Sequence, residues 1–387
     1  MFRPKFAQEL EGLKERSLYR SRKIHEGPQG IEVVIDGRVL VNFCSNDYLG
    51  LANHPAVVEA LQLGARRFGV GSGSSHLICG HGVAHHALEK ELAEFTGFAR
   101  VLVFSTGFMA NLGVISTLIG KGDRVLEDRL NHASLFDGGI LSGARFQRYA
   151  HSNLIVLAEL LAQGKDCKQL VVTDGVFSMD GDLADLPNLS RLCESFDAGL
   201  FVDDAHGFGV LGQNGRGLLE HFGLKPESVS ILVGTLGKAF GTFGAFAAGS
   251  EEVIEYLIQR ARPYLYTTAL PPALAEATRA SLKIVAKEHW RREKLASLIA
   301  RFRNKALEHR LPLLDSKTPI QPLLLGDSRL AIDIADRLMR KGILVMPIRP
   351  PTVPARSARL RITFSALHEE SHIDRLVEEL AHVCAHL

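Results

Sequence analysis

Three chemically useful positions follow apolar runs of the sequence. Gly107 and Phe108 come after the run VLVF (101–104) and begin an expected helix, whose unpaired backbone N–H groups would bind an anion such as phosphate. Asp203 is the first of the two aspartates that end the run GLFVDD (199–204). Lys238 lies 35 residues further on, in the glycine-rich and largely apolar segment GTLGKAFGTFGAFAAG. Desolvation there would lower the pKa of Lys238 and free its amine for a Schiff base.

Each feature alone has an ordinary explanation: a tight turn, a carboxylate that caps a turn, or a solvated lysine. Together they supply what pyridoxal 5'-phosphate (PLP) requires, namely an anion cradle, a partner for the pyridinium nitrogen and a Schiff-base amine. The sequence contains neither G-x-G-x-x-G nor the P-loop pattern, so it supports neither a dinucleotide fold nor a P-loop.

Seven motifs, in order over essentially the whole chain, resemble those of the α-oxoamine synthases, a family of PLP enzymes. They are FCSNDYLGL (43–51), STGFMAN (105–111), NHASL (131–135), DGVFSMDGD (174–182), VDDAHGFGVLG (202–212), TLGKAFG (235–241) and RPPTVP (349–354). The resemblance implies a homodimer with the α/β fold of aspartate aminotransferase (PLP fold type I). A large domain with a mostly parallel seven-stranded sheet and a smaller α+β C-terminal domain are expected.

The resemblance also implies roles for residues that contact the PLP ring. Lys238 would hold PLP as a Schiff base, and Asp203 would pair with the ring nitrogen and keep it protonated. His132 would stack on the ring and help to orient the acyl group. His206 would hydrogen-bond the phenolic oxygen, with Ser178 near the same edge.

Further residues are expected at the two ends of the site. The backbone of Gly107 and Phe108, with the Thr235 hydroxyl, would hold the phosphate. Four residues would face the substrates: Arg20, Asn46, Arg349 and Thr352. Arginine is suited to bidentate capture of a carboxylate.

RPPTVP followed by ARLRIT most resembles the family members of biotin biosynthesis. The implied reaction is a decarboxylative condensation of L-alanine with pimeloyl-CoA or pimeloyl-acyl carrier protein. The alternatives are the glycine C-acetyltransferase, 5-aminolevulinate synthase and serine palmitoyltransferase activities of the same family. A non-catalytic subunit on the same fold is a further alternative, which the intact Lys238, Asp203 and His132 disfavour.

Three positions depart from the family pattern without touching the lysine or its aspartate. Asp174 stands where relatives often carry Glu, Gly234 where Ser or Thr is frequent, and His76 where Arg is common. These departures leave the core chemistry in place and affect the expected substrate contacts.

No metal and no nucleic acid are expected. His81, His85 and His86 include an i, i+4 pair, but no acidic residue stands at H-E-x-x-H spacing, so a helix-surface cluster is favoured over zinc. The basic run RREK (291–294) has acidic residues nearby and is typical of a solvated helix face.

Short apolar runs separated by helical patterns indicate a mostly parallel sheet covered on both faces. An opening amphipathic helix and a hairpin around Asp36 and Gly37 occupy residues 1–49. The PLP-binding domain is expected over 50–262 and the smaller domain over 263–387. In order, the expected strands of both domains are 101–104, 124–128, 169–174, 199–204, 230–235, 245–249, 322–325, 343–347 and 359–364.

Composition is that of an ordinary globular protein. The 387 residues carry 45 Lys plus Arg against 43 Asp plus Glu, which argues against a surface that binds polyanions throughout. Five scattered cysteines suit reduced thiols. The start of the chain has no signal-peptide pattern, and the uncharged stretch Val101–Gly120 is polar enough to predict strand, turn and helix rather than a membrane span. A cytoplasmic enzyme is expected.

Glycine is the compositional anomaly, with 36 residues. Many of them fall in the motifs, so we expect the surplus to line the cofactor site, with Gly107 and Gly237 as examples.

Overall fold

The computed structural model describes residues 2–164 and 166–385, which divide into two compact units. The larger unit comprises 49–178 and 183–292; the smaller unit comprises the chain up to 48, 179–182 and the chain from 293 onward. The first predicted boundary, 49/50, lies one residue from the boundary of these units. The second falls at 292/293 instead of 262/263, because helix α11 (Pro272–Lys287) packs on helices of the larger unit.

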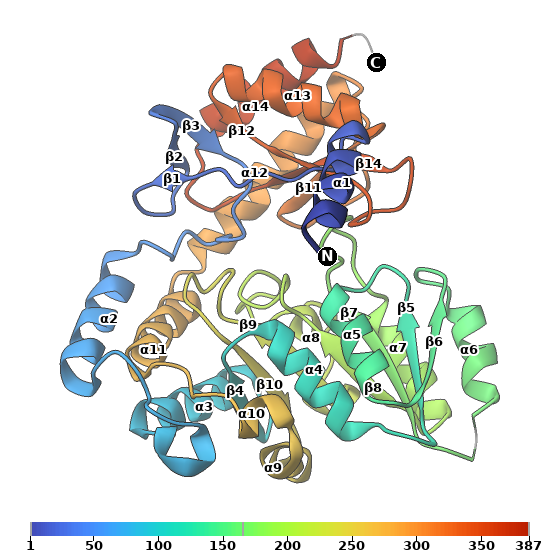
Figure 1. Cartoon of the computed structure of the whole chain (residues 1–387). Coiled ribbons are helices and arrows are strands. Elements are labelled where there is room, and N and C mark those ends of the chain that lie inside the picture. The colour runs from blue at the N-terminus through green and yellow to red at the C-terminus, as the bar shows by residue number, and fades with distance from the viewer. Residues whose placement is uncertain (1, 165, 386–387) are drawn as a thin grey trace. The chain divides into compact units, whose positions relative to one another are not determined.

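A seven-stranded sheet forms the centre of the larger unit, in the order β4-β10-β9-β8-β7-β5-β6 (Figure 1). Its strands are β4 Arg100–Phe104, β5 Arg124–Asp128, β6 Arg145–Tyr149, β7 Gln169–Asp174, β8 Gly199–Asp203, β9 Ile231–Thr235 and β10 Ala245–Gly249. Only β10 runs antiparallel to its neighbours in this sheet. The predicted mostly parallel seven-stranded sheet is confirmed.

Helices flank this sheet, as the buried character of its strands requires. The helices of the larger unit are α2 Pro55–Phe68, α3 Val83–Thr96, α4 Gly107–Leu118, α5 Ala133–Leu141, α6 Leu154–Ala162, α7 Leu186–Ser195, α8 Leu218–His221, α9 Glu251–Arg260, α10 Arg262–Leu265 and α11, with the short helical turns η1 His76–Gly80 and η2 Pro226–Ser228. Alternate strand residues such as Leu102, Phe104, Val172 and Val233 pack with Val114 of α4 in one buried cluster. The period of two places these side chains on one face.

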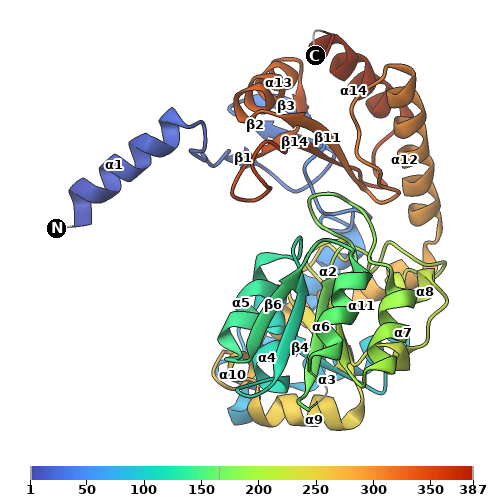
Figure 2. The same cartoon turned by 90° about the vertical axis from the view of Figure 1, so that its right-hand side faces the viewer.

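The smaller unit contains two small sheets, β1-β2-β3-β12 and β11-β14-β13. Their strands are β1 His25–Glu26, β2 Glu32–Ile35, β3 Arg38–Asn42, β11 Ile320–Gly326, β12 Ile343–Leu344, β13 Met346–Ile348 and β14 Ala358–Thr363. The remaining helices are α1 Phe2–Glu15, α12 Trp290–Glu308, α13 Ser328–Arg340 and α14 Glu370–Val383. Helix α13 packs against strands of both sheets and against α14 (Figure 2).

Strand pairing explains why the N-terminal segment belongs to this unit. The predicted hairpin forms between β2 and β3, and Asp36 and Gly37 both have the positive φ that a type I′ turn requires. Strand β3 then pairs in parallel with β12, so residues 41–42 and 343–344 share one sheet. The predicted strand 343–347 was wrong as a single element, because its two halves pair in different sheets.

The stretch that raised the question of a membrane span forms strand β4 and helix α4. Across 2–164 and 166–385, no helix combines the length and apolar character needed to cross a membrane.

Candidate active site

A cavity of about 200 Å³ opens in the larger unit, beyond the carboxyl ends of strands β4, β5, β7, β8 and β9. This edge of a parallel sheet is where ligands bind in open α/β folds. The structure brings all eight predicted cofactor residues to this one cavity: Gly107, Phe108, His132, Ser178, Asp203, His206, Thr235 and Lys238. Four residues without a predicted role also line it: Asn111, Ser134, Asp174 and Ala205.

Asp203 stands at the end of β8 and is buried. Its Oδ2 accepts a hydrogen bond from Asn111 Nδ2 at 2.6 Å, and its Oδ1 accepts one from the backbone N–H of Ala205 at 2.9 Å. These two donors hold the carboxylate in one orientation. The carboxylate is therefore preorganised to meet a cationic group in the cavity.

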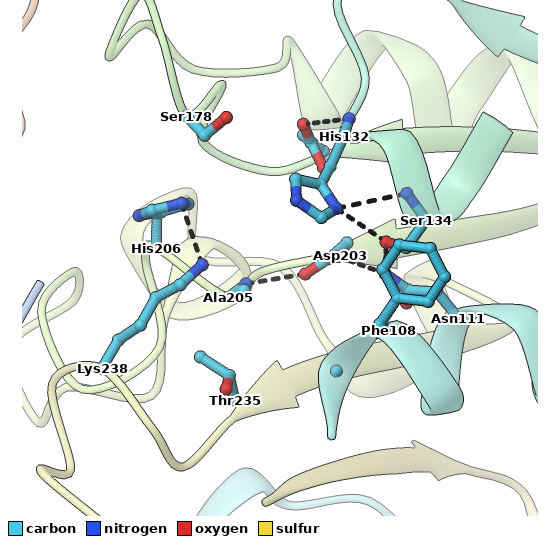
Figure 3. A pocket seen from close by; sticks show the side chains of 12 residues that line it. Phe108, Asn111, His132, Ser134, Ser178, Asp203, Ala205, His206, Thr235 and Lys238 are labelled. Carbon is cyan, nitrogen blue, oxygen red and sulfur yellow. Dashed lines mark hydrogen bonds between the residues drawn. The ribbon is translucent and has the colours of Figure 1, made fainter. Parts of the chain in front are cut away.

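A chain of hydrogen bonds continues from Asp203 to His132 (Figure 3). Asn111 Nδ2 also donates to Ser134 Oγ at 2.8 Å, and Ser134 Oγ lies 2.7 Å from His132 Nδ1. The backbone N–H of Ser134 points at the same ring nitrogen, at 3.3 Å. Because a backbone N–H can only donate, Nδ1 is an acceptor, and the neutral ring of His132 carries its proton on Nε2.

His132 is anchored by its backbone as well. Its N–H donates to Asp174 Oδ2 at 2.9 Å, while the backbone N–H of Asp174 donates to Asn131 Oδ1 at 2.9 Å. Desolvation lowers the pKa of His132, the Lys238 charge lowers it further, and Asp203 opposes both. Burial raises the pKa of Asp174 well above its usual value, and Asp203 adds to the rise. The ring of His132 is thus held neutral and fixed at the cavity wall.

Lys238 follows strand β9, and its Nζ lies 2.9 Å from Nε2 of the buried His206. Figure 3 shows the Lys238 amine, the Asp203 carboxylate and the His132 ring directed toward a common space. An imidazole nitrogen at this distance can accept a hydrogen bond from the amine. The arrangement provides a nucleophilic amine and a fixed anionic partner in one cavity.

The anion-binding end of the cavity is the N-terminus of α4. Thr106 caps the helix by accepting the N–H of Met109 at 3.1 Å, and Gly107 and Phe108 form the first turn. A Cβ built on Gly107 would meet only the Cβ of Ala245, at 4.0 Å, so the fold itself does not require glycine there. A helix N-terminus that leaves this space open fits a phosphate group. The lysine, the aspartate and this cradle together match the donor set that PLP needs.

Asp204, the neighbour of Asp203, has a different environment. It is fully buried, its Oδ2 accepts the N–H of Leu218 at 2.7 Å, and burial raises its pKa to about 8. Its carboxyl group holds the loop that leads to α8. Asp203 therefore faces the cavity, whereas Asp204 supports the loop.

Packing explains two of the three departures from the family pattern. A Cβ at Gly234 would lie 2.5 Å from the ring of Phe246, so a larger residue cannot fit beside that ring. His76 is buried and stacks on Tyr264 at 4.6 Å, and desolvation lowers its pKa to about 3. A neutral imidazole thus replaces a charged side chain in an apolar contact.

The expectation that glycines chiefly line the site was wrong. Gly107 is the only glycine among the described residues that line the cavity. Gly241 and Gly209 have positive φ, and a Cβ on either would lie within 3.0 Å of a neighbouring residue. Most motif glycines therefore meet the needs of turns and close packing.

Of the five predicted substrate residues, His132 belongs to the larger unit, and the other four, Arg20, Asn46, Arg349 and Thr352, belong to the smaller unit. Arg20 Nη2 donates to Thr352 Oγ1 at 2.9 Å, and Arg349 Nη1 donates to the Ser17 carbonyl at 2.6 Å. Burial lowers the pKa of Arg349, and the nearby Arg20 lowers it further. Within the described parts of the chain, neither guanidinium forms an ion pair with a carboxylate.

Asn46 lies in a different contact of the same unit. Its Oδ1 accepts hydrogen bonds from Arg361 Nη1 at 3.1 Å and from the Tyr48 hydroxyl at 3.2 Å. Its predicted contact with substrate stays a prediction.

A family model places the chain in a class of proteins. The model described as aminotransferase class I and II matches residues 38–380. The chain belongs to this family.

Curated relatives sharpen the assignment. An 8-amino-7-oxononanoate synthase of Methylococcus capsulatus is 62% identical over 97% of this chain and 97% of its own length. One of Nitrosococcus oceani is 60% identical over 97% of this chain and its full length. The predicted resemblance to the α-oxoamine synthases of biotin biosynthesis is confirmed.

Solved structures agree in fold. A serine palmitoyltransferase from S. paucimobilis, with a bound PLP–myriocin adduct, superposes with a TM-score of 0.93 at 30% identity and covers 98% of this chain and 97% of its own. An 8-amino-7-oxononanoate synthase from Francisella tularensis gives 0.79 at 34% identity, covering 89% and 98%. The predicted fold class is confirmed.

Proposed function

We propose that the protein catalyses the reaction for which the curated relatives described above are named, the formation of 8-amino-7-oxononanoate. L-Alanine condenses with a pimeloyl thioester: a bond forms between the alanine α-carbon and the thioester carbonyl carbon, the thiol leaves, and the alanine carboxylate departs as CO2. The observation that supports this most directly is the convergence of Lys238, Asp203 and the N-terminus of α4 on one cavity.

PLP, when bound as a Schiff base through Lys238, supplies an electron sink for the carbanion that forms at the amino-acid α-carbon. Lys238 provides the amine, and the same amine is the natural base for the α-proton once the substrate amine has displaced it. His206 Nε2, at 2.9 Å from Lys238 Nζ, can hydrogen-bond that amine and hold it at the cavity. Asp203 supplies the fixed negative charge that pairs with a protonated ring nitrogen.

His132 forms one wall of the cavity and orients what binds there. Its ring position is set by Ser134 through Nδ1 and by the bond of its backbone to Asp174. The neutral tautomer leaves Nε2–H as a donor for an acyl oxygen. Its role is thus to position the acyl group without adding positive charge.

Arg20 and Arg349 are the proposed partners for the substrate carboxylates. Two guanidinium groups that lack a carboxylate among the described residues suit an anionic ligand, and Thr352 holds Arg20 in place. The pimeloyl chain ends in a carboxylate, which distinguishes it from the acyl groups of the alternative activities. We assign Arg349 and Thr352 to that end.

The homodimer and the cytoplasmic location stay predictions, and both CoA and acyl carrier protein remain candidate carriers. The non-catalytic alternative is disfavoured because every predicted cofactor residue lines one cavity.

Product identification by mass tests the proposal. Purified protein with PLP is incubated with alanine, glycine or serine against pimeloyl, acetyl or palmitoyl thioesters. We expect 8-amino-7-oxononanoate from alanine and pimeloyl-CoA as the main product. Lys238→Ala should abolish turnover and the borohydride-reducible adduct, whereas Lys225→Ala, at an exposed lysine, should retain both. A main product from glycine or serine would replace the proposal with an alternative activity.

A further inference from the structure

A second cavity, of about 530 Å³, lies in the larger unit and shares no described lining residue with the first. Turn η1, helix α3, strand β4 and helices α9 and α10 contribute to it. Among its lining residues, His81, His86 and Glu89 form a cluster of metal-binding side chains. The PLP chemistry proposed above uses none of them.

The three side chains converge. One ligand atom from each of His81, His86 and Glu89 lies within 4.8 Å of the other two, and His81 Nε2 is 3.9 Å from Glu89 Oε2. His86 and Glu89 stand three residues apart on α3, so they occupy the same face of the helix. His81 reaches them from the turn that precedes the helix. Two imidazoles and one carboxylate form a ligand set that divalent transition metals prefer.

Neighbouring groups orient these ligands. His81 Nδ1 is hydrogen-bonded to His76 Nδ1 at 3.0 Å, and His76 is itself fixed by stacking on Tyr264. Glu89 Oε1 accepts the backbone N–H of Val103 at 3.0 Å. His81 and Glu89 therefore each use one polar atom for support, and their other polar atoms, Nε2 and Oε2, lie 3.9 Å apart. Such support is characteristic of metal ligands.

His85, the i+4 partner of His81, does not belong to the cluster, and its full burial shows that the predicted helix-surface position was wrong for this residue. Its Nδ1 accepts the backbone N–H of Gly82 at 3.0 Å, and its Nε2 is hydrogen-bonded to the Leu270 carbonyl. Both ring nitrogens are thus occupied by backbone groups. The carboxylate comes instead from Glu89, at a spacing that the H-E-x-x-H pattern does not cover.

The charges around the cavity permit a cation. Arg100 lines the cavity, but its guanidinium pairs with Glu251 at 2.6 Å and with Glu255 at 2.8 Å. Lys90 is the other basic side chain of the lining, and it lies at an exposed position of α3. Carboxylates thus offset the positive charge nearest the cluster.

We propose that His81, His86 and Glu89 bind one Zn²⁺ ion. Ligand atoms of a tetrahedral zinc site are separated by roughly 3.3 Å, as follows from zinc–nitrogen distances of about 2.0–2.1 Å. Binding therefore requires the three ligand atoms to move closer than the 3.9 Å that now separates His81 Nε2 from Glu89 Oε2. The fourth position faces the cavity and takes water or a small anion. The ion joins the turn before α3 to the helix itself, so its role is to stabilise this part of the larger unit.

Calorimetric titration of the chelator-treated holoenzyme with Zn²⁺ tests the site. The wild-type protein is expected to bind one ion per chain at this site, and Zn²⁺ is expected to raise its Tm. His86→Ala removes an exposed ligand and Glu89→Gln keeps an oxygen for the Val103 N–H, so both variants should fold. Each should weaken this binding at least tenfold and lose the Tm shift.

Two matched controls locate the ion. His221→Ala removes an exposed histidine of α8, and Cys79→Ser removes the exposed thiol of η1, which is itself a strong zinc ligand. Both should bind Zn²⁺ like the wild type. Equal affinity in the wild type and in His86→Ala would overturn the proposal, and so would loss of binding in Cys79→Ser alone. Activity is not the readout, so the proposal stands or falls separately from the proposed reaction.

Discussion

The cavity of the larger unit and the arginines of the smaller unit use polar groups in opposite ways. Around the cavity, hydrogen bonds join four side chains in the order Asp203, Asn111, Ser134 and His132. In the smaller unit, Arg349 is held by the backbone carbonyls of residues 17 and 19, without a carboxylate partner among the described residues.

This difference separates two tasks. When the polar groups of a network hydrogen-bond to one another, they fix the geometry of the reacting groups before a ligand binds. This is electrostatic preorganisation. Guanidinium groups without a counter-ion keep their strongest interaction for a ligand. We therefore expect substitutions in the hydrogen-bonded network around the cavity to lower kcat. Substitution of the arginines should instead raise the KM for one of the two substrates.

The largest expected effect is the difference in kcat between the variants Asp203→Asn and Asp204→Asn. Asp203→Asn removes the charge that faces the cavity and should lower kcat by about 10²–10³-fold or more, the scale of losing one preorganised electrostatic contact. Asp204→Asn should change kcat less than tenfold, because burial raises the pKa of Asp204 to about 8 and its carboxyl is largely protonated at neutral pH. Steady-state kinetics on both variants measures the contrast, and similar losses would contradict the division of the pair.

The network itself is tested at Asn111. Asn111→Ala removes the donor to Asp203 and should lower kcat by roughly 10–100-fold, as expected for a lost hydrogen bond to a charged group. Ser134→Ala should lower kcat less. If the four residues act as one unit, the double variant loses less than the product of the two single losses. Fully multiplicative effects would mean that the two residues act independently.

Arg349 tests the other side of the comparison. Arg349→Ala should raise KM for the pimeloyl thioester about tenfold or more and leave KM for alanine nearly unchanged. Arg349→Lys should restore only part of the affinity for the pimeloyl thioester, because lysine lacks the bidentate geometry of arginine. Arg329→Ala, at an exposed arginine of α13, is the matched control. A merely structural role, in which Arg349 secures the segment around Ser17, would instead impair both substrates equally.

The fold was predictable where strands are buried on both faces. Runs such as 124–128 and 169–174 became strands with the expected bounds, since continuous apolar sequence requires cover on both sides. Strand β6 had no such signal: its sequence RFQRY is polar and only its last residue is buried, as befits the edge of a sheet. The division of 343–347 between two sheets depends on distant pairing partners, which local sequence does not encode.

The site was predictable for a related reason. Residues at strand ends must meet at one edge of a parallel sheet, and the motifs mark those positions. Asn111, Ser134 and Asp174 lie inside the same motifs, yet their roles were missed. Those roles are hydrogen bonds between separate elements, so the motif positions were the only signal. The glycine surplus was wrongly assigned to the cofactor site, because turn geometry and close packing select glycine as readily as a ligand does.

The remaining expected effect concerns stability instead of activity and again distinguishes Asp204 from Asp203. Folded Asp204 keeps its proton up to about pH 8, whereas an aspartate in the unfolded chain loses it near pH 3.9. Between these values the folded state binds more protons, so this residue makes the free energy of unfolding fall as pH rises, by at most about 1.4 kcal/mol per pH unit. Asparagine does not titrate. Urea unfolding from pH 5 to 8 should therefore show the wild type losing stability relative to Asp204→Asn. A pH-independent difference in the free energy of unfolding between the two proteins would mean that Asp204 is already ionised at pH 5. The contrast in kcat between the Asp203 and Asp204 variants could then not be explained by the charge of the two side chains.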